Sequence, residues 1–175
     1  MRSIGLLITR VIFGSYLAVH GAQKLFGSFG GPGLDKLGAS FESIGLRPGK
    51  PQAALAGVAE LGGGLLTATG IASPLGPLAI AGTMAVASTT HRKNGPLAVN
   101  GGYELPLTNL ALAVALLTTG PGHLRLGPAA PKWMIRLSFL GGAALAANSV
   151  KQLLAPPPLV AADDHPTETE DAASA

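Results

Sequence analysis

One carboxylate, Glu60, stands alone in a long apolar stretch of this chain, and it is the first residue to consider for chemistry. Between Pro51 and Thr90 it is the only Asp, Glu, Lys or Arg. An ionisable side chain inside a membrane is costly, so it usually faces the interior of a helix bundle, has a partner and serves a function. Glu60 is therefore the first candidate catalytic residue, as a group that exchanges a proton.

Four further polar side chains fall near the expected ends of apolar helices. His20 and Lys24 are four residues apart, so helical spacing places them on one face. His91 follows one apolar segment and Glu104 begins the next. In an up-down bundle these helix ends lie on one side of the membrane. The predicted ligand-binding residues are thus His20, Lys24, Glu60, His91 and Glu104, with His20 as a second catalytic candidate.

Each of these residues also has a structural interpretation. Lys24, His91 and Glu104 can be snorkelling or capping groups. Glu60 can be half of a buried ion pair with Lys24 or, from the other direction, with Arg10, which makes Arg10 a structural pairing candidate. The small apolar residues around Glu60 favour the proton-exchanging interpretation over the ion pair.

Few cofactors fit the sequence. The chain has no cysteine, so it cannot supply a thiolate metal site, a disulfide or thiol chemistry. Zinc-ligand spacing, a phosphate-binding loop and a nucleophile elbow are all missing from the sequence, and no metal site is predicted. Haem ligation by His20 and His91 is the weaker alternative, because both look like end-of-helix residues. The residues themselves indicate no other cofactor.

The composition indicates a membrane protein of one domain. The 175 residues are 47% hydrophobic and 12% charged, whereas about a quarter of the residues are charged in soluble proteins. The net charge is only +3 and the basic residues are scattered, which argues against nucleic acid as a partner. The expected partners are the lipid bilayer and further copies of this chain.

Apolar segments separated by turns predict an all-α fold, a membrane-embedded four-helix bundle with an extra C-terminal helix. The spans are predicted near 4–26, 53–72, 75–90 and 105–120, with a fifth at 133–154. For the fifth segment the alternative is a helix lying on the bundle surface. Together these segments form one transmembrane domain, residues 1–155. Residues 156–175, rich in Pro, Ala and acidic residues, are expected to be a disordered acidic tail.

Two local patterns add detail to this bundle. A short amphipathic helix, with Leu34, Leu37, Phe41 and Ile44 on one face, is expected to lie in the membrane interface between the first two spans. Gly14 and Gly21 are seven residues apart in the first span and fall on nearly the same face. Small residues so placed predict close approach of a neighbouring backbone.

The basic residues favour one orientation. Six Lys or Arg residues lie in the loops after the first and third spans, and fewer lie in the loops on the other side. The excess places those two loops, and with five spans also the tail, in the cytoplasm.

Several motifs together carry a resemblance to a known family. They are Arg10, His20-Gly21-x-x-Lys24-Leu25-Phe26-Gly27, Glu60-Leu61-x-Gly63-Gly64-Leu65-Leu66, Gly101-Gly102-Tyr103-Glu104-Leu105 and Gly120-Pro121-Gly122. In order and spacing they resemble the DoxX family of small bacterial membrane proteins, over roughly residues 5–128. The resemblance implies a four-helix membrane bundle and leaves the fifth span and the tail outside the family pattern.

The resemblance also implies a function. Relatives resemble the membrane subunit of a thiosulfate:quinone oxidoreductase, and others are associated with redox-homeostasis complexes. This implies a multi-pass protein of the bacterial cytoplasmic (inner) membrane, serving as the membrane subunit of a quinone-linked redox system with a polar intramembrane pocket. The alternative is a non-catalytic membrane anchor or assembly protein without a ligand. A small-solute transporter is a third hypothesis, opposed by the lack of repeated halves.

One motif departs from the family pattern. After Gly120-Pro121-Gly122 the chain continues His-Leu-Arg-Leu-Gly, where relatives commonly show a Ser-Leu-Asp-like ending. The resemblance therefore carries no acidic site residue to this turn.

Overall fold

The computed structural model describes residues 2–156, which form six α-helices and no strand. The all-α prediction is confirmed. The helices are α1 (Arg2–Phe26), α2 (Gly33–Ser43), α3 (Gly49–Thr69), α4 (Leu75–Thr90), α5 (Glu104–Thr119) and α6 (Lys132–Leu154), joined in part by the 3-10 helices Ser28–Gly30, His91–Asn94 and Ala98–Asn100. Apart from its first residue, the predicted tail lies outside the described residues.

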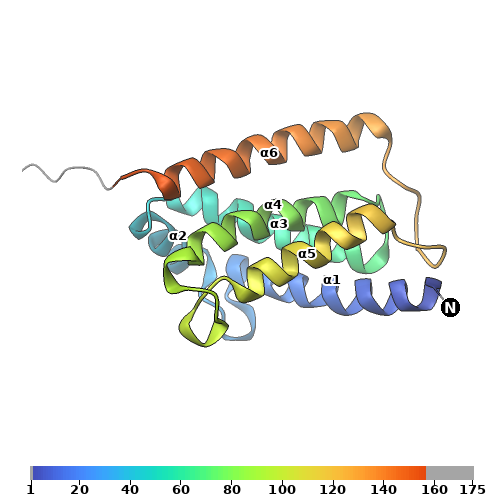
Figure 1. Ribbon diagram of the computed structural model, residues 1–175, viewed down its shortest axis with the longest axis horizontal. Coiled ribbons are helices and arrows are strands. Elements are labelled where there is room, and N and C mark those ends of the chain that lie inside the picture. The colour runs from blue at the N-terminus through green and yellow to red at the C-terminus, as the bar shows by residue number, and fades with distance from the viewer. Residues whose placement is uncertain (1, 157–175) are drawn as a thin grey trace, which may run out of the picture.

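Figure 1 shows α1, α3, α4, α5 and α6 running lengthwise and alternating in direction. At one end, here called the α2 end, α1, α4 and α6 finish, α3 and α5 begin, and α2 packs against α1 and α3. The other end, here called the N-terminal end, holds the start of α1, the α3–α4 turn and the α5–α6 loop. Contacts join α1 to α3, α3 to α4, and α4 to both α5 and α6. Because the helices alternate in direction, polar side chains at the same end of the bundle can contact one another, and those at opposite ends cannot.

The end of α3 differs from the expected one. The helix stops at Thr69, whereas the sequence suggested residue 72. Gly70 has a left-handed conformation, with φ of 72°, and its N–H donates to the carbonyl of Leu66. A glycine in this conformation is a common way to end a helix, because it has no Cβ to clash. Apolar composition continued past Gly70, so hydropathy alone did not reveal the end.

Helices α1 and α3 pack with their backbones close together. A Cβ on Gly14 would lie 2.5 Å from the backbone of Gly64 and Ala68, and a Cβ on Gly21 would lie 2.2 Å from the backbone nitrogen of Leu61. No real Cβ tolerates such distances, so the two backbones are in direct contact. The close approach predicted from the spacing of Gly14 and Gly21 is confirmed.

The apolar core lies between α1, α4 and α5. Its buried members are large side chains from all three helices with one alanine, namely Phe13, Leu17, Ile80, Met84, Ala113 and Leu116. The glycine contact on one face of α1 and this core on another hold α1 on two sides. Its remaining face is outside.

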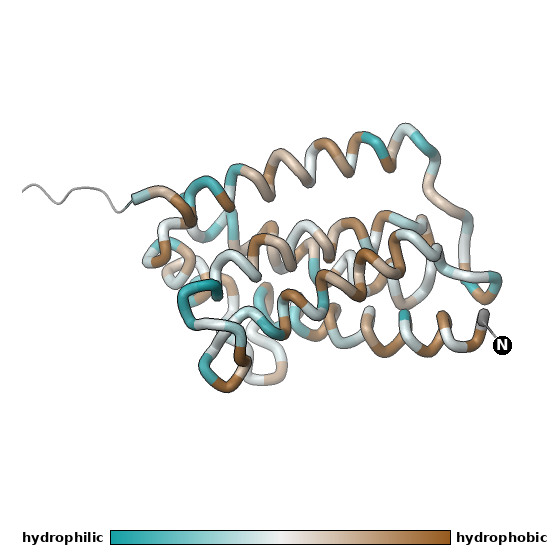
Figure 2. Tube along the Cα trace, in the orientation of Figure 1, coloured by the Kyte–Doolittle hydropathy of each residue, from teal (hydrophilic) through white to brown (hydrophobic). Residues whose placement is uncertain are grey.

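Large apolar side chains also cover the outside of the bundle. Ile12 is 66% exposed, Trp133 62% and Leu137 63%, and Figure 2 shows that hydrophobic residues recur along α1, α5 and α6. Among residues 2–156, one helix, over Ile4–Phe26, is long and apolar enough to cross a membrane by length and composition. Both α4 and α5 have 16 residues, a rise of about 24 Å against a hydrocarbon core of about 30 Å. The four-helix membrane bundle therefore stays a prediction.

The short helix α2 lies where the amphipathic helix was predicted. It packs against α1 and α3, with Leu34, Leu37 and Phe41 half-buried and Asp35 and Lys36 exposed. Ile44, the fourth residue expected on the apolar face, follows the end of the helix and is exposed, so the apolar face is shorter than predicted. The position of α2 in a membrane interface stays a prediction.

Candidate polar site

Two charged side chains are buried in the bundle, and they belong to different sites. Arg10 of α1 is 3% exposed and Glu60 of α3 is 1% exposed. Burying a charge is costly unless it is paired or hydrogen-bonded. The partners of these two side chains therefore define the polar chemistry of the interior.

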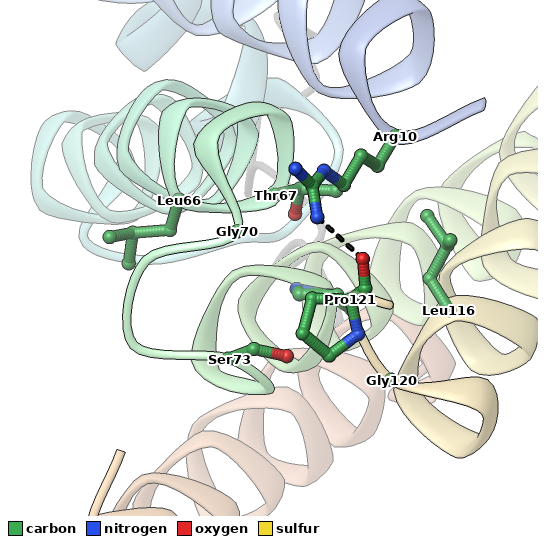
Figure 3. Close-up of a pocket in the computed structure, with 9 residues that line it drawn as sticks. Arg10, Leu66, Thr67, Gly70, Ser73, Leu116, Gly120 and Pro121 are labelled. Atoms are coloured by element: carbon green, nitrogen blue, oxygen red, sulfur yellow. Dashed lines mark hydrogen bonds between the residues drawn. The ribbon is translucent and has the colours of Figure 1, made fainter. Parts of the chain in front are cut away.

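Arg10 bonds to the backbone of the α5–α6 loop. Its two terminal nitrogens donate to the carbonyl oxygens of Pro121 and Leu124, and Figure 3 shows the first of these bonds. Arg10 lies beside Gly70, whose Cβ position would be 2.8 Å from a guanidinium nitrogen. Ten residues of α3 separate Gly70 from Glu60, a rise of about 15 Å. Arg10 is thus not the partner of Glu60.

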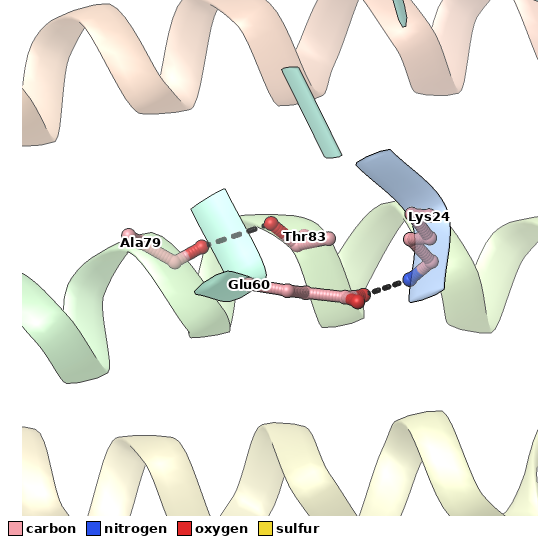
Figure 4. Close-up of polar contacts among 4 residues, drawn as sticks. All are labelled: Lys24, Glu60, Ala79 and Thr83. Carbon is pink, nitrogen blue, oxygen red and sulfur yellow. Dashed lines mark hydrogen bonds and ion pairs between the residues drawn. The ribbon is translucent and has the colours of Figure 1, made fainter. Parts of the chain in front are cut away.

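Glu60 pairs with Lys24 across the α1–α3 contact (Figure 4). The Lys24 side chain is 25% exposed and Glu60 only 1%. Next to Lys24, the Leu25 side chain lies over Gly57, where a Cβ would be 2.7 Å from Leu25 Cγ, so the missing side chain lets this part of α1 approach α3. The second carboxylate oxygen, Oε2, is buried without a hydrogen-bond partner in the described part of the chain. Glu60 is therefore a buried carboxylate with one oxygen bonded to Lys24 and the other without a partner among the described residues, and Lys24 itself is partly exposed at the protein surface.

His20 lies one helical turn before Lys24 on α1. Its half-buried ring meets the ring of Tyr16 edge-on, with centroids 4.5 Å apart and an interplanar angle of 77°. Helical spacing keeps His20 on the Lys24 side of α1. His20 is thus a neighbour of the ion pair with an aromatic contact of its own.

His91 and Glu104 close the loop between α4 and α5. His91 Nδ1 lies 2.8 Å from the carbonyl oxygen of Gly101. Glu104 Oε2 accepts a hydrogen bond of 2.8 Å from the N–H of Ala98. Both residues lie at the α2 end, as the up-down arrangement predicted, but their described hydrogen bonds are to this loop.

The structure therefore divides the predicted site. It brings Lys24 and Glu60 into contact, places His20 on the adjacent turn, and uses His91 and Glu104 in a loop. Within residues 2–156 no group of three or more His, Asp or Glu side chains could hold a metal ion.

Sequence reasoning missed the partners of Arg10. Pro121 belongs to a motif that was used for the family resemblance but given no contact, and Leu124 was not singled out. Both contribute backbone carbonyl oxygens, which every residue has, so no residue type marked them. A glycine-proline turn after an apolar helix was the only available signal.

Comparison with known proteins gives one result. The family model described as DoxX matches residues 5–92, just over half of the 175 residues. The matched range includes His20, Lys24, Glu60 and His91, and it ends before Glu104, short of the 5–128 expected from the motifs. Comparisons with curated proteins and with solved structures found no match.

Proposed function

Because the chain belongs to the DoxX family, we propose that it is a multi-pass protein of the bacterial cytoplasmic membrane and the membrane subunit of a quinone-linked redox system. Membership of this family indicates a membrane protein. The observation that carries the redox proposal is the Lys24–Glu60 pair, a buried carboxylate with a free oxygen and a lysine that reaches the outside.

The distribution of side chains supports the membrane part of the proposal. Large apolar residues are exposed along α1, α5 and α6, while the ion pair and Arg10 are inside. Exposed apolar surface of this extent needs a cover, and hydrocarbon tails would provide it. Intramembrane charges normally face the bundle interior and bond there to an opposite charge, as in the Lys24–Glu60 pair, or to backbone carbonyl oxygens, as Arg10 does.

Cysteine labelling tests the orientation, since the chain has no cysteine of its own. Ser40, Ala129 and Ala155 are exposed at the α2 end, in the α5–α6 loop and after α6. We expect Ser40→Cys and Ala155→Cys to be protected from an impermeant maleimide in intact spheroplasts, and Ala129→Cys to react. Labelling in inverted vesicles should reverse the pattern.

The same experiment can contradict the proposal in two ways. Reaction of Ser40→Cys in intact spheroplasts would reverse the orientation. Identical behaviour of Ala129→Cys and Ala155→Cys would mean that α6 does not cross the membrane.

In the proposed mechanism each partner of the pair has a separate task. Lys24 is part-exposed, so its ammonium group can donate a hydrogen bond to a carbonyl oxygen of the quinone. The Glu60 carboxylate would relay a proton from water to that oxygen. Reduction of a bound quinone to the quinol would consume two electrons, supplied by a partner redox protein, and two protons, both drawn from water. This chain provides binding, orientation and a proton path.

A non-catalytic anchor or assembly protein is the second candidate function. Arg10, His91 and Glu104 all bond to loop backbone. Polar residues used in this way fasten the bundle and need no ligand. Under this alternative the Lys24–Glu60 pair fastens α1 to α3 in the same manner.

Quinone titration separates the two functions. We expect purified protein to bind a menaquinone analogue saturably, and the neutral double variant Lys24→Met/Glu60→Gln to bind at least tenfold more weakly. The matched control is the exposed Lys50–Asp35 pair, with 2.6 Å between Nζ and Oδ1. Neutralising that pair should leave binding unchanged. Absence of saturable binding to the wild type, or equal binding by both double variants, would contradict the redox proposal.

A further inference from the structure

Basic side chains surround the point where the chain leaves α6, at the α2 end of the bundle. The Gln152 side chain accepts a hydrogen bond of 2.8 Å from the N–H of Arg47 and donates one of 3.0 Å to the carbonyl oxygen of Arg47. Arg92 donates a hydrogen bond of 3.4 Å to the carbonyl oxygen of Leu153. Both arginines thus lie beside the last turn of α6. With two lysines next to them they form what is here called the basic surface, the exposed residues Arg47, Arg92, Lys93 and Lys151.

No carboxylate among residues 2–156 neutralises the basic surface. The four carboxylates there have partners elsewhere, namely Lys24 and Lys50 for Glu60 and Asp35, and backbone N–H groups for Glu42 and Glu104. Like charges gathered in one place repel one another and attract a segment of opposite charge. The basic surface therefore favours an acidic occupant.

The sequence that follows α6 has the opposite charge. Residues 157–175 contain five acidic residues, all within 163–171, and no Lys or Arg. The seven residues from Pro156 to Asp163 can span up to about 25 Å. A connection this short holds the acidic segment near the basic surface at an effective concentration on the order of millimolar. Since α6 ends at the α2 end (Figure 1), the segment and the surface are on the same side of a membrane in either orientation.

We propose that the basic surface binds the acidic segment 163–171 of the same chain. One exposed ion pair stabilises such a contact only weakly, so the contact depends on several pairs acting together and on the short connection to α6. Salt weakens it, because the screening length falls from about 10 Å at 0.1 M to about 3 Å at 1 M. While the segment is bound, the basic surface is closed to anionic lipid headgroups and to acidic partner proteins. This contact is independent of any quinone chemistry.

Carbodiimide crosslinking of the purified full chain in detergent tests the contact, because this reagent joins a carboxylate directly to a lysine amine. We expect mass spectrometry to find crosslinks between the acidic segment and Lys93, which lies after α4 and not on α6. Lys132 is the matched control, an exposed lysine at the other end of α6, and should form none. The exposed Lys50–Asp35 pair, with 2.6 Å between Nζ and Oδ1, provides a reference crosslink. Relative to this reference, the Lys93 yield should fall at least about fivefold in 1 M salt.

Arg47→Gln removes one charge from the basic surface and should lower the Lys93 yield about threefold, the effect of one exposed ion pair. Arg125→Gln removes an exposed charge at the N-terminal end and should leave the yield unchanged. Equal crosslinking of Lys93 and Lys132, or a reference crosslink without any crosslink to Lys93, would overturn the proposal. A Lys93 yield that neither salt nor Arg47→Gln reduces would also overturn it.

Two further measurements distinguish the acidic segment of the same chain from other occupants. In a mixture of unlabelled and isotope-labelled protein, we expect the Lys93 crosslinks to join peptides of one isotope only. Mixed crosslinks would assign the surface to the segment of a second copy. In nanodiscs that contain phosphatidylglycerol, the Lys93 crosslinks should persist. Their loss there, with retention in phosphatidylcholine nanodiscs, would mean that anionic headgroups occupy the basic surface and would overturn the proposal.

Discussion

Replacing Lys24 with Met should destabilise the detergent-solubilised protein much more than replacing Glu60 with Gln. Without Lys24, the 1% exposed carboxylate keeps its burial and loses its counter-charge, a situation that costs about 3–5 kcal/mol in soluble proteins. In Glu60→Gln, the amide oxygen still accepts a hydrogen bond from Lys24. The lysine is 25% exposed, so water still solvates part of its charge, and we expect a cost of about 1–2 kcal/mol.

The double variant Lys24→Met/Glu60→Gln provides the control for this asymmetry. It contains no unpaired buried charge, so it should recover a large part of the stability lost in Lys24→Met. Melting temperatures of the four proteins form a double-mutant cycle, which isolates the coupling between the two side chains. If Glu60→Gln is at least as stable as wild type and Lys24→Met costs nothing, Glu60 is neutral. That is the proton-exchanging state favoured by the sequence alone.

Gly21→Ala should disrupt the bundle as severely as the loss of Lys24. The new methyl group would lie 2.2 Å from the nitrogen of Leu61 and 2.7 Å from the carbonyl oxygen of Gly57. Backbone atoms cannot rotate away, so α1 and α3 must separate. We expect a loss of at least about 3 kcal/mol, the upper range for overpacking, measured as a lower melting temperature and a reduced yield of monodisperse protein.

Gly62→Ala is a matched control for this prediction. Gly62 lies next to the contact on α3, but its Cβ position has nothing within 4 Å. Alanine favours helix over glycine by about 1 kcal/mol, so this variant should be as stable as wild type or more stable. Equal damage from Gly21→Ala and Gly62→Ala would mean that α1 and α3 are not in backbone contact.

Helix positions could be predicted from the sequence because apolar segments and turn residues are both local signals. The start of α5 at Glu104 and the end of α4 at Thr90 agree with the predicted segments to within a residue. The predicted end of α3 lay three residues beyond the observed one, at residue 72 instead of Thr69. The reason is that a glycine within an apolar stretch can either continue a helix or end it. Only the backbone conformation of Gly70 decides between these outcomes.

The partners of the buried charges could be predicted only in part. The sequence left both Lys24 and Arg10 as possible ion-pair partners of Glu60, one toward each end of α1. Choosing between them requires the register of α1 against α3, that is, which residues of the two helices lie opposite each other. Gly21 against Leu61 and Gly14 against Ala68 fix that register. The partners of Arg10 lie more than a hundred residues away and are main-chain atoms. A sequence carries no marker for contacts of that kind.

The backbone contact between α1 and α3 also bears on how the chain enters a membrane during synthesis. The helix that passes the criteria for crossing is α1, and it is made first. By contrast, α3 combines a carboxylate with a glycine-rich sequence, and on its own it would partition weakly into lipid. In the proposed membrane arrangement, Lys24 and the glycine face at Gly14 and Gly21 would already be in place when α3 leaves the ribosome. The first helix would then receive the third as it enters the membrane, and the order of the two helices along the chain would help the membrane to tolerate Glu60.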